Sequence, residues 1–250
     1  EDSSRKLGID ELQDPAVSAR FRSGVASGES LNFSYTASAI WLRLQVRNTS
    51  DAPLVRMLEV ASPLLAQLAF YQPQPGGGFQ AIETGYALPF AQRPHASRYF
   101  VWPVTLPAQS DQFLYVRIAT PNSMVLPLTL WEPEAFHAHE RADYVFQALY
   151  FGSALAIILY NLMLFVALRD RSYLLYVVSA AFSALTVAAF VGVGTEYLWG
   201  DWPQLTKIAT NLSLAIALTA FLLFTRRMLF TALWVPKLDR LLKLFVGVNL

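Results

Sequence analysis

Histidine and acidic side chains gather in one short segment before the first long apolar run. His137 and His139 lie two residues apart, beside Glu134, Glu140 and Asp143. In a β-strand alternate residues share a face, so the two imidazoles could bind one metal ion, whereas on a helix residues two apart diverge. Because the sequence defines no third ligand, we favour a solvated linker before the apolar run and expect no metal site and no cofactor.

Aromatic and arginine side chains alternate with aliphatic ones in two segments of the first half. Those that point away from the aliphatic face are our candidate ligand-binding residues: Trp41, Arg43, Arg47, Tyr115 and Arg117. Aromatic rings stack on the apolar C–H faces of sugars, and arginine donates forked hydrogen bonds to hydroxyl or carboxylate groups. The alternative is structural, because such rings and arginine stems also cover the edges of a sandwich. Both interpretations stay open.

Residues for other common chemistries are missing from the sequence. The chain has no cysteine, which excludes disulfides, thiol catalysis and cysteine-ligated metals. Its serines are not flanked by the glycines of a nucleophile elbow, and the apolar runs contain no histidine that could act as a base. The sequence therefore does not indicate a serine nucleophile. The run Gly76–Gly78 lacks the Lys and Ser/Thr of a phosphate loop, and His95 receives no role. We therefore expect no catalytic residues and no enzyme in this chain.

Composition divides the chain into two halves. Hydrophobic residues make up 54% and charged residues only 15%, against about 45–50% and about 25% in a typical soluble domain. Residues 1–140 hold most of the prolines and charges, whereas residues 145–250 are mostly Leu, Ala, Val, Phe and Tyr. The formal net charge of +1 gives no indication of a nucleic-acid partner. The pattern predicts a water-exposed domain over 1–138 and a membrane domain over 139–250.

The first half predicts an all-β fold of the sandwich type. Apolar and polar residues alternate in short runs that end at turn residues, as in Asn48–Asp51 and PQPGGG. Short strands with such turns are typical of a β-sandwich. In the first run, we expect Ile40, Leu42, Leu44 and Val46 to face the core. The predicted strands are Ile40–Arg47, Leu54–Ala61, Gln67–Gln72, Phe100–Leu106, Phe113–Thr120 and Met124–Trp131.

Apolar runs in the second half predict a helical transmembrane bundle. Three spans are expected at about 145–168, 173–195 and 206–225, each close to the roughly 20 residues that cross a bilayer. A fourth run begins near Leu241 and is incomplete at Leu250, so we expect a truncated bundle over 139–250. A very apolar soluble bundle is the alternative, but its helices would carry polar stripes. Within the spans, Asn161 and Asn211 are expected to hydrogen-bond between helices.

Charges in the loops predict which side of the membrane each half faces. The first loop, Arg169–Ser172, and the third, from Arg226 to Lys243, are basic, whereas the second, Glu196–Lys207, is acidic and rich in aromatic residues. Basic residues mark cytoplasmic loops, so the first and third loops face inward and the N-terminal half lies outside. A chain that begins with Glu1 also suggests a removed signal peptide, although a cloning boundary explains it equally well.

Several segments, taken in order, resemble the bacterial seven-transmembrane receptors with diverse intracellular signalling modules. The segments are AIWLRLQVRNTS (39–50), LEVASPLLAQLAFYQ (58–72), TGYALPFAQRP (84–94), FLYVRIATPNSMVLPLTLWEPEAF (113–136), LYFGSALAIILYNLMLFVALRDRSYLLYV (149–177) and WVPKLDRLL (234–242). The resemblance implies an extracytoplasmic jelly-roll β-sandwich, similar to carbohydrate-binding modules, followed by a seven-helix membrane domain.

The resemblance implies a bacterial inner-membrane sensor with a periplasmic N-terminal domain. The sandwich would bind a periplasmic small ligand, with a glycan as one candidate, and the helices would relay the event to a cytoplasmic output, a diguanylate cyclase or histidine kinase, absent from this chain. It also implies contact with the lipid bilayer and signalling as a homodimer. The alternative is a non-signalling transport or envelope assembly protein with a periplasmic module.

Overall fold

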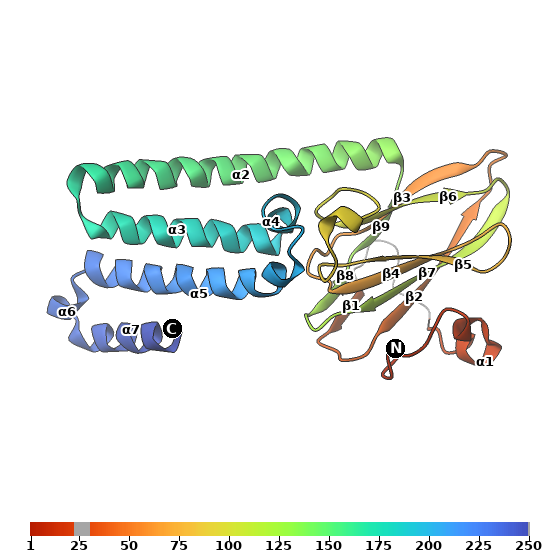
Figure 1. Ribbon diagram of the computed structural model, residues 1–250, viewed down its shortest axis with the longest axis horizontal. Helices are drawn as coiled ribbons and strands as arrows, with labels where there is room; N and C mark the ends of the chain where they lie inside the picture. Colours follow the sequence, from red (N-terminus) through yellow and green to blue (C-terminus); the bar gives the residue numbers. More distant parts are fainter. Residues whose placement is uncertain (23–30, 250) are drawn as a thin grey trace. The chain divides into compact units, whose positions relative to one another are not determined.

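The computed structural model describes residues 1–22 and 31–249. Clustering of contacts divides the chain into two compact units. The first contains Glu1–Ala138 and Thr195–Pro203, and the second contains His139–Gly194 and Gln204–Leu250. The first unit holds the strands, and the second holds most of the helical residues (Figure 1).

Nine strands in the described residues form three antiparallel sheets. The sheets have the strand orders β2-β7-β4-β5, β6-β3-β9 and β1-β8. The strands are β1 (Leu31–Ser34), β2 (Ile40–Asn48), β3 (Leu54–Val60), β4 (Gln67–Pro73), β5 (Phe79–Thr84), β6 (Phe100–Leu106), β7 (Ser110–Ala119), β8 (Met124–Leu126) and β9 (Leu128–Trp131).

One apolar core lies between the four-stranded and the three-stranded sheets. Phe70 of β4 and Trp102 of β6 are fully buried, and their ring centroids lie 5.4 Å apart. The expected inward residues Ile40 and Leu42 are part of this core, and Leu44 packs against it. The predicted all-β sandwich followed by apolar helices is therefore confirmed.

Two features of the sandwich differ from the prediction. Met124–Trp131 forms two strands in different sheets, because Pro127 has no N–H to donate to a continuous ladder. The short strands β1 and β5 were not predicted. The turn between β4 and β5 is the predicted one: Gln74 and Gly78 are joined by a backbone hydrogen bond of 3.1 Å, and Gly78 adopts a φ of 79° that favours glycine.

Within the described residues, three helices are long and apolar enough to cross a membrane: α2 (Pro133–Leu168), α3 (Arg171–Phe190) and α5 (Pro203–Met228). Helix α2 has 36 residues, which corresponds to about 54 Å. It begins well before the predicted span, so the predicted linker with His137 is the first part of a helix. The remaining helices are α4 (Val193–Tyr197), α6 (Thr231–Trp234) and α7 (Pro236–Asn249).

The charged break between α2 and α3 is a tight turn, as expected. Asp170 caps α3 by accepting hydrogen bonds from the Ser172 backbone N–H and hydroxyl at 2.8 and 2.9 Å. Arg227, in the last turn of α5, lies 3.3 Å from Asp170. The first and third loops therefore lie at the same end of the helices, as their shared basic character predicted.

Hydroxyl groups join α3 to α5. Ser179 donates to the carbonyl oxygen of Ala217 at 3.1 Å, and the Thr186 hydroxyl donates to Ser213 at 2.8 Å. Our expectation for the asparagines was wrong in the case of Asn161, which donates to Ile157 within its own helix. Small hydroxyl residues provide this contact because they allow the two backbones to approach closely.

Asn48 closes the end of β2 with a buried side chain. Its amide nitrogen lies 2.8–3.2 Å from the carbonyl oxygens of Ala52, Leu106 and Pro107. Its amide oxygen accepts hydrogen bonds from the Ser50 backbone N–H and hydroxyl at 2.9 and 2.7 Å. Asn48, which ends the alternation of apolar and polar residues in β2, thus fixes the turn that follows β2 and the one that follows β6.

We expect Asn48→Ala to lower the free energy of unfolding of the sandwich by about 1–3 kcal/mol, because buried carbonyl groups lose their donor. Thermal unfolding followed by tryptophan fluorescence measures the loss. Thr49→Ala, at the exposed neighbouring position, is the control and should leave the transition unchanged. Equal transitions for the two variants would contradict the structural role of Asn48.

Candidate functional site

The structure brings the candidate ligand-binding residues together on one face of the four-stranded sheet. In the β2–β7 pair, Trp41 lies opposite Arg117, Arg43 opposite Tyr115, and Arg47 opposite Asp111. Because alternate residues of a strand share a face, all of them lie on the face opposite the core. We call this surface the outer face, defined by Trp41, Arg43, Arg47, Tyr115 and Arg117.

An N-terminal segment covers most of the outer face. This segment, residues 1–21, is named the strap; it includes η1 (Glu11–Gln13) and α1 (Pro15–Ser18) (Figure 1). Leu12 of the strap forms a buried cluster with Trp41 and Tyr115, which are only 6% and 3% exposed. Ile9, Val17 and Phe21 pack against the same cluster from the strap. The two aromatic candidates are thus buried beneath a separate segment.

The arginines of the outer face also contact the strap. Arg43 donates a hydrogen bond to the Ser18 hydroxyl at 2.7 Å, and its guanidinium lies 4.6 Å from the centroid of the Phe21 ring. Arg117 donates to the backbone carbonyl oxygen of Arg5 at 2.8 Å. The strap therefore places oxygen acceptors on two arginines and apolar groups on the rings.

Arg47 lies outside the covered area and pairs with Asp111. Its guanidinium lies 2.8 Å from the Asp111 carboxylate, and Gln45 donates to the same carboxylate at 3.0 Å. The hydrogen bond from Arg47 and then that from Gln45 hold the pKa of Asp111 below its usual value. Both partners are partly exposed, so this pair contributes little to stability. It leaves Arg47 accessible at the rim of the outer face.

Asp2 fixes the start of the strap. Its backbone exchanges hydrogen bonds of 2.7 and 2.8 Å with Ala39, just before β2. Its carboxylate accepts hydrogen bonds from the backbone N–H groups of Ser4, Arg5 and Leu7 at 3.0–3.1 Å. Burial alone would raise the pKa of Asp2, but these hydrogen bonds and one from the Ser4 hydroxyl outweigh it and lower the pKa.

A second contact ties a loop of the helical half to the sandwich. Residues Thr195–Pro203 belong to the same compact unit as the strands. The Phe90 N–H donates to the carbonyl oxygen of Gly200 at 2.9 Å. A Cβ added at Gly200 would lie 2.6 Å from the Thr195 carbonyl oxygen and 2.8 Å from the Phe90 Cβ. Glycine is therefore required for this close approach.

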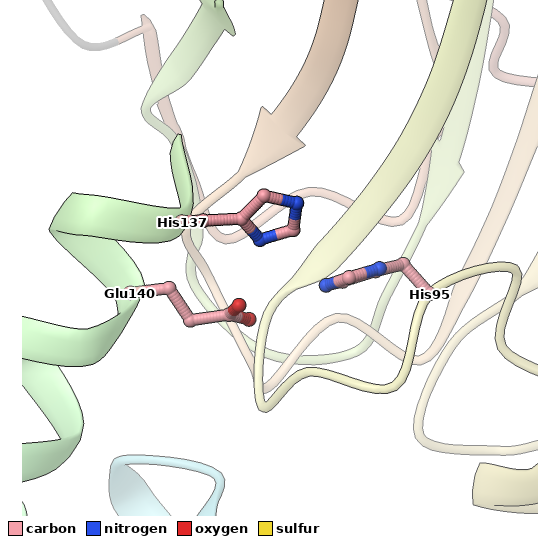
Figure 2. A group of neighbouring side chains, drawn as sticks. All are labelled: His95, His137 and Glu140. Atoms are coloured by element: carbon pink, nitrogen blue, oxygen red, sulfur yellow. The ribbon is translucent and has the colours of Figure 1, made fainter. Parts of the chain in front are cut away.

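Three side chains that the sequence did not bring together could hold a metal ion. His95, His137 and Glu140 each offer a ligand atom, and these atoms lie within 4.8 Å of one another (Figure 2). His137 and His139 do not share a face, because they lie on a helix, where residues two apart diverge. The available signal was the spacing of His137 and Glu140, which places both on one side of a helix.

Comparison with protein families assigns both halves of the chain. The model described as 7TMR-DISM extracellular 2 matches residues 1–132, and the model described as 7TM diverse intracellular signalling matches residues 143–250. The chain belongs to the seven-transmembrane receptors with diverse intracellular signalling modules. It is a membrane receptor with an extracellular sensor domain. None of the curated proteins compared with the receptor matches it.

The receptor should release the first turns of its strap in acid. The pKa of Asp2 is lowered in the folded state, so its stabilising contribution is present above the unfolded pKa, near 3.9, and is lost as the pH falls through the folded pKa. Hydrogen exchange of residues 3–7, corrected for intrinsic rates, should be faster at pH 3 than at pH 7. Asp2→Asn should show fast exchange already at pH 7, and slow exchange in that variant would contradict the role of the carboxylate.

We expect Gly200→Ala to detach the 195–203 loop from the sandwich, because the added methyl group has no space. The Phe90 amide of the receptor would lose its acceptor, a loss of about 0.5–1.5 kcal/mol, and its hydrogen exchange should become several-fold faster. Gly152→Ala is the matched control, since a Cβ at Gly152 meets nothing within 4 Å. Unchanged exchange at Phe90 in Gly200→Ala would contradict the docking of the loop.

Proposed function

We propose that the chain is the sensing and membrane part of a bacterial inner-membrane receptor whose sandwich lies in the periplasm and binds a glycan on its outer face. The membrane domain would pass the binding event to a cytoplasmic diguanylate cyclase or histidine kinase. A homodimer, as the family resemblance implies, stays a prediction. The family assignment favours this function over transport or envelope assembly.

The contacts of the strap are the observation that carries the proposal. Leu12 packs on Trp41 and Tyr115, while Ser18 supplies an oxygen acceptor to Arg43. A sugar offers the same two kinds of group, namely apolar C–H faces for aromatic rings and oxygen atoms for guanidinium donors. The strap therefore covers the outer face with the same kinds of group, apolar surface and oxygen acceptors, that a glycan would present to it.

Competition between strap and glycan makes a two-state sensor. With the strap in place the face is closed, and a ligand binds only when the strap has moved away. A ligand that binds the open form shifts the equilibrium towards it by its differential affinity, and its apparent affinity falls by the fraction of molecules that are open. Weakening the strap should therefore tighten binding without any change in the outer face itself.

Two chain connections lead from the sandwich to the spans. Helix α2 follows β9 after Glu132 and continues as the first apolar helix. The 195–203 loop, held to the sandwich through Phe90 and Gly200, runs directly into α5. A change in the sandwich can thus reach the first span through α2 and the third through the loop.

Loop charges support a periplasmic sandwich. Arg169 and Arg171 lie in the loop at the end of the helices where Arg227 meets Asp170. Basic loops are retained in the cytoplasm, so this end faces inward. The 195–203 loop follows α3 at its opposite end and belongs to the sandwich unit, which is consistent with both lying outside.

The test measures binding of neutral and uronate-containing oligosaccharides to the full chain in lipid nanodiscs by calorimetry. We expect Leu12→Ser to tighten binding by at least about tenfold, because the strap loses most of the roughly 1.5–3 kcal/mol from burying a leucine. We expect Trp41→Ala to abolish binding. In the unmodified chain, bound sugar should speed hydrogen exchange in residues 5–21.

Ala16→Ser is the matched control, because Ala16 lies in the strap but is exposed; it should bind as the unmodified chain does. If neither the unmodified chain nor Leu12→Ser binds any sugar of the panel, the glycan proposal is wrong. If Leu12→Ser binds no more tightly than Ala16→Ser, the strap does not compete with the ligand.

A further inference from the structure

The three residues of Figure 2 lie where the sandwich joins the first helix. His95 belongs to the loop between η2 (Phe90–Gln92) and β6, and His137 lies in the second turn of α2. Their rings are 6.0 Å apart between centroids. The chain has three histidines and no cysteine. Two of the histidines lie together at this junction, although they are far apart in the sequence, at positions 95 and 137.

Aromatic packing holds the two imidazoles in place. Phe136 is 1% exposed and belongs to a buried cluster with Met57 and Val101. The rings of His95 and His137 each lie 5.4 Å from the Phe136 ring in edge-to-face contact. The ligand side chains therefore rest on a residue whose own position is fixed by the core.

The loop that carries His95 is held by Arg93. The guanidinium of Arg93 donates to the carbonyl oxygens of Ser97 and Arg98 at 2.6 and 3.1 Å, and it lies 4.6 Å from the centroid of the Phe100 ring. These contacts close the loop on both sides of His95. A ligand atom on such a loop has little conformational freedom to lose when it binds an ion.

Helix geometry supplies the third ligand. The compact sandwich unit ends at Ala138, but α2 runs without interruption from Pro133. Residues three apart on a helix are neighbours, so Glu140 lies beside His137 whatever follows further along the helix. The Nε2 atom of His95 and the Oε1 atom of Glu140 are shielded from solvent, whereas the His137 side chain is exposed.

We propose that His95, His137 and Glu140 bind a divalent transition-metal ion of the zinc class. Two imidazole nitrogens and one carboxylate oxygen are a known ligand set for zinc, with a water molecule in the fourth position. Tetrahedral bonds of 2.0–2.1 Å would bring the ligand atoms to about 3.3 Å from one another, so atoms now within 4.8 Å need only small side-chain rotations. Calcium and magnesium prefer all-oxygen sites and do not fit.

The proposed site departs from our expectation that no metal binds. That expectation rested on the lack of a third ligand near His137 and His139, and His95 provides it from a distant loop. A bound ion would fasten this loop of the sandwich to the beginning of α2. Binding of the metal ion does not depend on any ligand of the outer face, so the metal proposal and the glycan proposal can be tested independently.

The test is calorimetry with Zn²⁺ alone on the full chain in lipid nanodiscs, purified without a polyhistidine tag. We expect one Zn²⁺ per chain, and at least about tenfold weaker binding in His95→Gln, His137→Gln and Glu140→Gln, since even the loss of groups that only support ligands costs 10–100-fold. His139→Gln is the matched control, because it removes a neighbouring imidazole outside the group, and it should bind as the unmodified chain does.

Two measurements on the unmodified chain guard against variants that do not fold. Co²⁺ should give the visible absorption of a tetrahedral site and be displaced by Zn²⁺ but not by Ca²⁺. Zn²⁺ binding should weaken as the pH falls, because metal ligands must be deprotonated to bind the ion. The proposal is overturned if no Zn²⁺ binds, if Ca²⁺ displaces Co²⁺, or if His139→Gln weakens binding while His95→Gln does not.

Discussion

The antiparallel register between β2 and β7 is the constraint on which both faces of the sandwich depend. Side chains alternate along a strand, so a slip by one residue would move every one of them to the other face. The register that pairs Ile40 with Ile118 in the core also places Trp41 and Arg43 outside. The core and the candidate binding surface are therefore two consequences of one pairing.

This constraint leaves the outer face with aromatic side chains that need a cover. Large apolar patches on a soluble domain usually mark sites of interaction. Here the cover is a segment with little regular structure, which contacts the face through the apolar side chains Ile9, Leu12, Val17 and Phe21 and through a few hydrogen bonds. None of the described strands of the three sheets pairs with this segment, so its departure would leave the sheet ladders intact. The structural and the ligand-binding interpretations of these residues are thus compatible. With the strap in place, the residues pack against it and have a structural role, and departure of the strap would expose them to a ligand.

Local patterns in the sequence predicted the sandwich strands and the long apolar helices, because period-two alternation and uncharged runs are properties of short segments. What the sequence did not predict depends on contacts between distant segments. The strap lacks a pattern that would direct Leu12 to Trp41. No pattern in the sequence around His95 indicates that it lies beside His137. The division at Pro127 follows from the missing N–H, but the assignment of β8 and β9 to different sheets depends on their partners β1 and β3.

The beginning of α2 combines the roles of core element and connection. Phe136 is buried in the sandwich together with Met57 and Val101, and the Trp131 indole donates to Glu59 at 2.7 Å, so the end of β9 and the first turn of α2 are both fixed. From Glu134 to Phe151 the helix contains neither glycine nor proline, the residues at which helices usually bend. The connection between the sensor and the first span is thus one continuous helix that lacks, over these residues, the residue types that favour a bend, and this is the local property that the proposed relay through α2 would need.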